Sequence, residues 1–210
     1  QNSTLNAGDV VSVTVTMSEP VSVTGIPQLM LAVGSNNRIA TYASGSGSSA
    51  LVFTYTIQAN DTDANGIAIA ANSLALNGGT ITDPAGNAAT LSHAAVADNS
   101  AYLVDTTAPV VSAVAITSAT GVQNSTLNAG DVVSVTVTMS EAVSVTGTPQ
   151  LTLNVGGTNR IAGYASGSST SALVFTYTIQ PGDTDSNGIA IAANSLALNG
   201  GTINDPAGNA

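Results

Sequence analysis

Apolar and polar residues alternate strictly along several short segments of the chain. In the segment 10–17 (VVSVTVTM), the residues at every second position from Val11 onward are Val or Met, and those between them are Ser or Thr. The segment 50–57 alternates in the same way, with Leu51, Phe53 and Tyr55 on one face. A period of two places successive side chains on opposite faces of an extended chain. The pattern therefore predicts half-buried β-strands.

The same alternation, punctuated by turn clusters rich in Gly, Ser and Asn, predicts seven strands in one folding unit. These strands are expected at 110–117, 10–17, 28–33, 38–43, 50–57, about 74–82 and 100–104. No stretch carries a convincing helical period. Seven short antiparallel strands with these spacings predict an all-β fold of two-sheet, immunoglobulin-like β-sandwiches.

The chain is a tandem repeat. Residues 1–19 return unchanged at 123–141, and the same offset holds to the C-terminus with 13 differences among the 88 positions compared. Self-similarity at a fixed period indicates successive copies of one folding unit. We therefore expect one unit at 1–104 and a second at 105–210.

The two expected units are incomplete in different ways. The first has no counterpart of the strand at 110–117, and the second has none of the segment 89–105. The join is expected near 104–109, where Pro109 stiffens a short linker.

Differences between the copies test the predicted faces of one strand. In 28–33, Met30 and Ala32 are replaced by Thr152 and Asn154 in the second copy, whereas the alternate Leu and Val residues are kept. Because both changes fall on one face, we expect that face to be exposed to water.

Composition narrows the classes of function. The formal charge is −10, and Arg38 and Arg160 are the two cationic side chains against twelve carboxylates. Nucleic acid and anionic membrane are therefore poor partners, and no stretch approaches the ~20 apolar residues of a membrane span. The chain has one His, no Cys and no Lys, and its Ser residues are scattered through turns. No nucleophile, base and orienting group are suggested together, so we do not expect an enzyme.

Five motifs in order carry a more specific resemblance. They are DTTAPVV at 105–111, SEPVSVTG with SEAVSVTG, GIPQLMLAV with GTPQLTLNV, YASGSGSSALVFTYTIQ, and DPAGN in both copies. Together they resemble the bacterial Ig-like extender repeats of giant RTX and biofilm-associated surface adhesins, over essentially the whole chain. The resemblance implies tandem domains at the bacterial cell surface, outside the cell, with calcium (Ca²⁺) stiffening the domain joints. It also implies neighbouring repeats as partners and a tip ligand bound outside these residues.

The acidic residues predict where such an ion binds. Loops that follow odd-numbered strands are expected at one pole of a unit, and loops that follow even-numbered strands at the other. The predicted interdomain calcium ligands are Asp61, Asp63 and Asp105 from the first copy and Glu141, Asp205 and Asn209 from the second. The equivalent half-sites are Glu19, Asp83, Asp183 and Asp185. Calcium takes six to eight oxygen ligands, and converging carboxylates repel one another without a cation.

The stretch DTDANG at 61–66 has two other interpretations. It matches the first half of an EF-hand loop, but the twelfth position is Asn72 instead of Glu, which excludes a full EF-hand. A partial calcium loop remains open, as does a polar turn that uses Asn-Gly for its backbone conformation. The other polar residues have plainer expected roles. Asp9 and Asp131 cap strand starts, His93 is a loop histidine, and the two Arg residues pair with carboxylates or lie along the sheet.

The expected function is that of a structural extender in a repetitive adhesin, serving adhesion or biofilm formation. Near-identical copies favour a spacer over a tuned binding site. Two alternatives stay open: a repeat unit of a surface layer or extracellular filament, and a ligand-binding Ig-like module. Glycan sites usually present exposed aromatic rings, and the few rings here fall mostly on inward strand positions.

Overall fold

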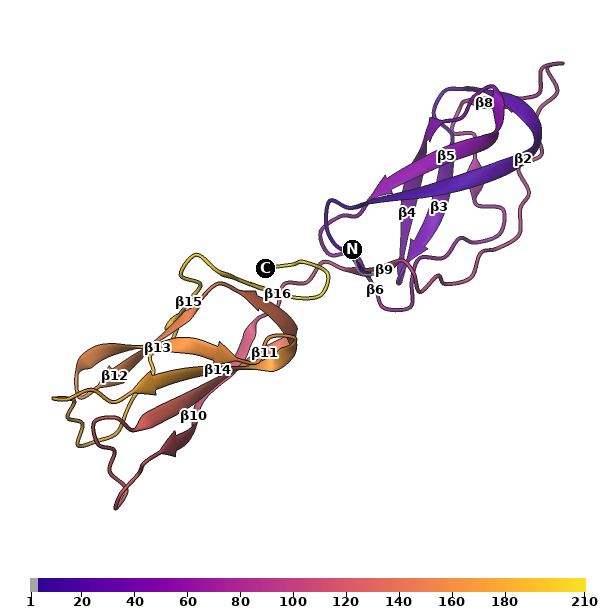
Figure 1. Cartoon of the computed structure of the whole chain (residues 1–210). Helices are drawn as coiled ribbons and strands as arrows, with labels where there is room; N and C mark the ends of the chain where they lie inside the picture. The colour runs from indigo at the N-terminus through magenta and orange to yellow at the C-terminus, as the bar shows by residue number, and fades with distance from the viewer. Residues whose placement is uncertain (1–3) are drawn as a thin grey trace. The chain divides into compact units, whose positions relative to one another are not determined.

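A computed structural model describes residues 4–210 and divides the chain into two compact units, Gln1–Thr107 (unit 1) and Ala108–Ala210 (unit 2). Figure 1 shows that each unit is built from strands and loops. No helix in the described residues is long and apolar enough to cross a membrane.

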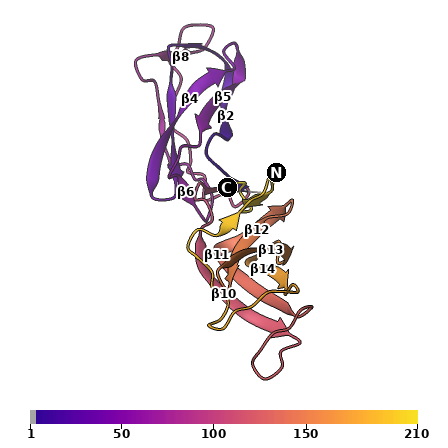
Figure 2. The ribbon, with the colours of Figure 1, turned by 90° about the vertical axis from the view of Figure 1, so that its left-hand side faces the viewer.

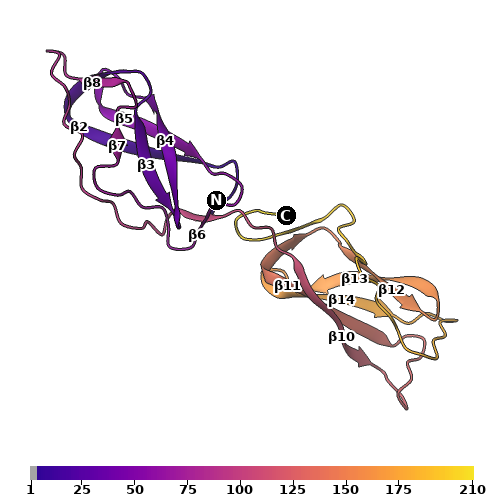
Figure 3. The ribbon, with the colours of Figure 1, turned by 180° about the vertical axis from the view of Figure 1, so that it is seen from behind.

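The described part of unit 1 contains nine strands. They are β1 (Thr4–Leu5), β2 (Val10–Thr24), β3 (Gln28–Val33), β4 (Asn36–Ser44), β5 (Ser48–Thr56), β6 (Thr62–Asp63), β7 (Leu74–Ala75), β8 (Thr80–Thr82) and β9 (Leu103–Asp105). The main pairing order is β7-β3-β4-β5-β2-β8, and β1-β9-β6 form a second, small sheet (Figure 3). All pairs are antiparallel except β1 with β9.

Unit 2 repeats this main sheet and adds a long first strand. Its strands are β10 (Val111–Thr120), β11 (Val132–Thr146), β12 (Gln150–Val155), β13 (Thr158–Ser166), β14 (Thr170–Thr178), β15 (Leu196–Ala197) and β16 (Thr202–Asn204). The pairing order is β10-β11-β14-β13-β12-β15, and Figure 2 labels β10 to β14 of this sheet. The strand β16 pairs with the far half of β11. Every pair in this unit is antiparallel.

Two strands of each unit change partner along their length. In unit 1, β2 pairs with β5 from Val10 to Thr16, shifts register, and then pairs with β8 from Ser22 to Thr24. Pro20 lies within the register shift between Thr16 and Val21. No regular β-ladder passes through this position, so the backbone N–H that proline lacks is not needed there. Likewise β4 pairs with β3 from Asn36 to Thr41 and with β5 from Thr41 to Ser44.

The alternating residues form one core in each unit. Leu29, Leu31 and Val33 of β3 are at most 1% exposed, and they cluster with Leu51 and Phe53 of β5. Met30 and Ala32, between the buried residues of β3, are only half-buried. The face predicted from the differences between the copies is therefore confirmed. Tyr42 packs edge-on against Phe53, and Tyr164 packs against Phe175 in the same way.

The predicted all-β, antiparallel class is confirmed, but the prediction of a single strand at about 74–82 was wrong. The segment 74–82 is two short strands on different partners, because Asn77 and Gly78 both adopt positive φ and turn the chain between them. The predicted strand 10–17 also continues to Thr24. The short β1 and β6 had too few alternating residues to be recognised from the sequence.

Candidate functional site

Asp61 is the most fully engaged acidic side chain of unit 1. It lies between β5 and β6, directly before β6, and is fully buried. Arg38 of β4 donates from Nε and Nη2 to Asp61 Oδ1 at 2.6 Å. The Tyr55 hydroxyl donates to Oδ2 at 2.5 Å, and the Gln58 backbone N–H donates to the same oxygen at 2.9 Å. Both oxygens of this carboxylate therefore accept hydrogen bonds inside the unit.

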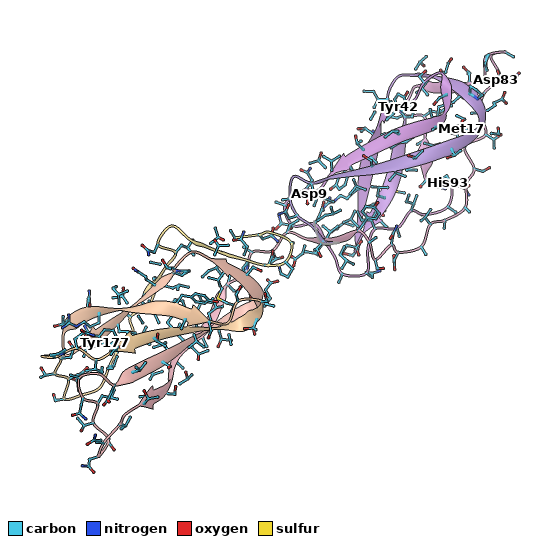
Figure 4. All side chains as sticks on the ribbon, viewed as in Figure 1. Asp9, Met17, Tyr42, Asp83, His93 and Tyr177 are labelled. Atoms are coloured by element: carbon cyan, nitrogen blue, oxygen red, sulfur yellow. The ribbon has the colours of Figure 1, made fainter. Side chains whose placement is uncertain are left out.

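The same network recurs in unit 2 around Asp183. Arg160 Nη2 lies 2.5 Å from Asp183 Oδ1, while the Tyr177 hydroxyl donates to Oδ2 at 2.5 Å and the Gln180 N–H at 2.9 Å. Figure 4 labels Tyr177 in this unit. Each Arg was expected to pair with a carboxylate or to lie along the sheet, and pairing is confirmed. The two partners, Asp61 and Asp183, were not predicted for this role.

Hydrogen bonding sets the ionisation of these groups. Burial raises the pKa of Asp61, but the donors Tyr55 and Gln58 and the guanidinium of Arg38 outweigh it, so that the pKa is lowered from 3.8. The Tyr177 hydroxyl and the Gln180 N–H lower the pKa of Asp183 against the effect of burial. Burial and the hydrogen bond to Asp61 raise the pKa of Tyr55 to about 12. Both carboxylates are thus held as anions.

Asp63 organises the DTDANG loop through backbone donors. Its Oδ1 accepts from the N–H groups of Asn65 and Gly66 at 3.2 and 2.8 Å, and its Oδ2 accepts from Gly34 at 2.7 Å. Gly66 has φ of +101°, and a Cβ there would meet the Asn99 carbonyl oxygen at 2.0 Å. The loop is a turn that the Asp63 carboxylate closes on itself and ties to the β3–β4 hairpin.

The corresponding DTDSNG loop of unit 2 is built in the same way. Asp185 accepts from the backbone N–H groups of Gly156, Asn187 and Gly188 at 2.9–3.1 Å. The Gly156 N–H is the main cause that lowers the pKa of Asp185. These contacts support the polar-turn interpretation of the loop in both units. The predicted role of Asp61, Asp63, Asp183 and Asp185 as calcium ligands stays a prediction, and their hydrogen bonds need no cation.

The two DPAGN segments are closed turns. Asp83 accepts from the backbone N–H and from Nδ2 of Asn87 at 2.8 and 2.7 Å, and the Asn87 side chain is the main cause that lowers the pKa of Asp83. Asp205 likewise accepts from the N–H and Nδ2 of Asn209 at 2.8 and 2.7 Å. In the structure, Asn209 thus holds the Asp205 carboxylate in place.

The structure brings a second carboxylate to each DPAGN turn. In unit 2, carboxylate oxygens of Glu141 and Asp205 lie within 4.8 Å of each other. Glu141 lies at the register shift of β11, and Asp205 directly follows β16, which pairs with β11 three residues further on. In unit 1, Glu19 and Asp83 line the same groove. Figure 4 shows Asp83 toward one end of unit 1, near Met17, and Asp9 toward the other.

The remaining predicted ligand, Asp105, lies at the end of unit 1 opposite Asp83. It is the last residue of β9 and pairs with Thr62 of β6, beside Asp63. Its Oδ1 accepts from the Thr107 N–H at 2.9 Å. Within unit 1 the structure therefore gathers Asp61, Asp63 and Asp105 at one end and Glu19 with Asp83 at the other.

Several other polar contacts have a structural role. The Asp9 carboxylate accepts from the Asn6 N–H at 3.0 Å and closes the turn before β2, and Asp131 does so in unit 2. His93 accepts from the Ser73 N–H at Nε2, which fixes a loop to the start of β7. The side chain of Asn65 also bonds to Asp98. No pattern in the sequence pointed to Asp98, because it lies 33 residues from its partner in a segment without periodicity.

Comparisons with protein-family models, with curated protein sequences and with solved structures found no match to this chain.

Proposed function

We propose that each unit is an immunoglobulin-like sandwich and that the chain is a structural extender of a repetitive bacterial surface adhesin, located outside the cell. The observation that carries the proposal is the recurrence of one unit with little change. Only 13 of the 88 positions compared differ, and each copy has its own core and its own Arg–Asp–Tyr network. Such copies add length without adding a new binding specificity.

The sandwich is supported by the strands that change partner. Strands that switch from one layer to another form the corners of packed sheets. β4 does so near Thr41, and β13 does so at Gly163, where pairing passes from β12 to β14. Buried residues of β3 and β5 meet in one cluster, as the two inner faces of a sandwich do. The motif resemblance to Ig-like adhesin repeats points to the same fold.

Two features support a spacer over a ligand-binding module. The two Phe side chains, Phe53 and Phe175, are fully buried in the cores. Tyr102, at 46%, is the one aromatic side chain among the large hydrophobic residues exposed in the described part of the chain. Glycan sites stack sugars on exposed aromatic rings, and a lone tyrosine in a loop offers little of such a platform.

We also propose calcium as the ion that stiffens successive repeats. Within unit 2, the Glu141 and Asp205 carboxylates approach closely enough to share one cation. Asp105 stays the predicted third ligand. It stands five residues before Val110 in the sequence, and Val110 bonds to Ser140, next to Glu141. We leave out Asp61, which the Arg38 guanidinium already neutralises, and Asp63, which closes its own loop. Asp205 also accepts hydrogen bonds from its own turn, but it has the carboxylate of Glu141 beside it.

Calcium titration and small-angle scattering of the chain test the proposal together. The expected result is calcium binding that is lost in Glu141→Gln and kept in Glu19→Gln, the matched change in unit 1. The largest dimension should be longer in calcium than in chelator for the wild type and for Glu19→Gln, and it should be the same in both solutions for Glu141→Gln. Binding that survives Glu141→Gln would remove this residue from the site. A largest dimension too short for two units in succession, with or without calcium, would contradict the extender.

A further inference from the structure

One hydroxyl group ties the start of the linker to unit 1. Thr106 follows β9 directly. Its Oγ1 accepts a hydrogen bond from the Asn60 backbone N–H at 3.0 Å and donates one to the Asp61 backbone carbonyl at 3.0 Å. A threonine hydroxyl can donate and accept at once, and its χ1 is stiff, so holding it in this place costs little side-chain entropy. One side chain thus bridges two successive residues of a distant turn.

The turn that Thr106 contacts is itself firmly held. The Asp61 N–H donates to the Gln58 carbonyl at 3.1 Å, and the Gln58 N–H donates back to Asp61 Oδ2 at 2.9 Å. The same buried carboxylate receives the Arg38 guanidinium and the Tyr55 hydroxyl. The Arg–Asp–Tyr network therefore fixes the turn on which the Thr106 hydroxyl is anchored.

The strand that leads into Thr106 is short at this end. The strand β9 pairs with β6 through two residue pairs, and Asp105 with Thr62 is the pair nearest the linker. On the other side of β9, β1 pairs with Leu103 and Val104. Such strand ends open readily unless something beyond them is held. The two hydrogen bonds of Thr106 lie directly beyond Asp105 and close this end of the ladder.

The segment after Thr106 has few free torsion angles. Three residues, 107–109, separate Thr106 from Val110. Val110 exchanges hydrogen bonds with Ser140 within unit 2. Pro109 has a fixed φ, and a residue that precedes proline is confined to extended conformations. The motion that the linker retains is therefore limited to a very short stretch, provided that Thr106 stays bonded.

We propose that Thr106 is a positioning residue, which clamps the start of the linker to unit 1 independently of calcium. The clamp transmits the rigidity of the Asp61 turn to Asp105 and confines the flexibility of the joint to residues 107–109. It deepens the proposed extender function, because a joint that is restrained in advance leaves less disorder for an ion to remove. The effect on calcium rests on the proposed function, whereas the clamp itself does not.

Nuclear magnetic resonance of the intact chain in chelator tests the clamp. Thr106→Val keeps the branched shape of the side chain and removes the hydroxyl. We expect it to speed hydrogen exchange at the Asn60 amide by about fivefold. The backbone order parameters of residues 105 and 106 should fall from the rigid range, about 0.85, toward the flexible range, below about 0.6.

Two further variants separate the hydroxyl from other effects of the change. Thr106→Ser keeps the hydroxyl and should retain the wild-type exchange and order. Thr107→Val makes the same change at the next, exposed side chain and should also match the wild type. The core amides of β5 should stay protected in all three variants, which shows that unit 1 is folded. In calcium, Thr106→Val should bind the ion up to about fivefold more weakly, because binding must then also order Asp105.

Two results would overturn the clamp. One is Asn60 exchange and linker order in Thr106→Val that equal those of the wild type. The other is a wild-type chain whose residues 105 and 106 are already flexible in chelator. Equal calcium affinity of the wild type and a loosened Thr106→Val chain would overturn the positioning of Asp105. If the wild type binds no calcium while Thr106→Val still loosens the linker, the clamp is supported and calcium is removed from the proposed function.

Discussion

Asp61 and Asp183 join three parts of their units with one side chain each. The carboxylate of Asp61 receives the Arg38 guanidinium from β4, the Tyr55 hydroxyl from the end of β5, and a backbone N–H of its own loop. Asp183 has the same partners in unit 2. A buried charge is tolerated when it is paired and fully hydrogen-bonded, and both conditions are met here.

Replacing Tyr55 by Phe removes one donor and leaves the ring in place. Hydrogen bonds to charged groups contribute about 1.5–3 kcal/mol to stability, and we expect Tyr55→Phe to lower the free energy of unfolding of unit 1 by that amount. Urea unfolding of the chain followed by hydrogen exchange at β5 measures the loss. The exposed Tyr102→Phe is the control, and equal stability of the two variants would show that the hydroxyl is dispensable.

Acid should weaken both units through the same carboxylates. Because the folded pKa of Asp61 lies below its usual 3.8, the stability it contributes is present above that value and is lost as pH falls through the folded pKa. We expect Asp61→Asn to be less stable than the wild type at pH 7, with a difference that shrinks below about pH 4. Thermal unfolding between neutral and acidic pH checks this, and a difference independent of pH would contradict it.

For single residues, the sequence predicted that a side chain would form an ion pair or bind an ion, but it did not predict which residue would be its partner. A carboxylate partner for each Arg was an expected outcome, because an isolated cation in an acidic chain rarely stays unpaired. Asp61 was instead assigned to calcium, because strand order places the DTDANG loop at the same end of the unit as Asp105. The competing donor Tyr55 lies on the preceding strand, and its reach to the loop depends on where β5 ends.

At the scale of the elements, alternation predicted the long strands well. The bounds of β3 agree with the predicted 28–33, and its buried residues are the ones kept in both copies. Short strands depend on pairing more than on pattern, so β1, β6 and the division of 74–82 could not be predicted from periodicity. The pairing of β2 with two successive partners follows from its bend, which alternation does not encode.

The turn between β4 and β5 offers a matched test of the backbone. Gly45 has φ of +110°, and a Cβ there would meet the Ala50 carbonyl oxygen at 2.0 Å. Gly47 has φ of +86° with open space around it, and unit 2 has Ser169 at that position with φ of 68°. We expect Gly45→Ser to cost at least ~2 kcal/mol in stability and Gly47→Ser ~1 kcal/mol or less. Denaturant unfolding of the two variants measures the difference, and equal losses would show that the close approach to Ala50 does not matter.

At the scale of the whole molecule, the repeat is the strongest signal in the sequence. An offset that holds without a gap from residue 1 to residue 210 predicts two units of one kind, and the structure contains two compact units with the same order of main strands. The placement of acidic loops at opposite ends of a unit follows from strand order alone. Strand order also grouped Glu141 with Asp205, and their carboxylate oxygens lie within 4.8 Å of each other. The register shift of β11 at Glu141 was not predicted, because alternation does not encode it.

The chain has a charge of −10 and only two cationic side chains, so its melting temperature should depend on salt. Comparing NaCl with CaCl₂ separates the screening of charges from the binding of calcium. Monovalent salt screens repulsion between exposed carboxylates, so the melting temperature should rise with NaCl in both units. Calcium at the same ionic strength should raise the melting temperature of unit 2 further, because a ligand that binds the folded state stabilises it by mass action.

Glu141→Gln should abolish the extra effect of calcium and keep the effect of NaCl, whereas the matched Glu19→Gln should keep both. Scanning calorimetry in NaCl, in CaCl₂ and in chelator measures the three effects. If calcium and NaCl act alike at equal ionic strength in the wild type, the acidic pair binds no ion and calcium has no place in the extender. If calcium raises the melting temperature of both units equally, and does so in Glu141→Gln as well, the ion acts at a feature that the two repeats share.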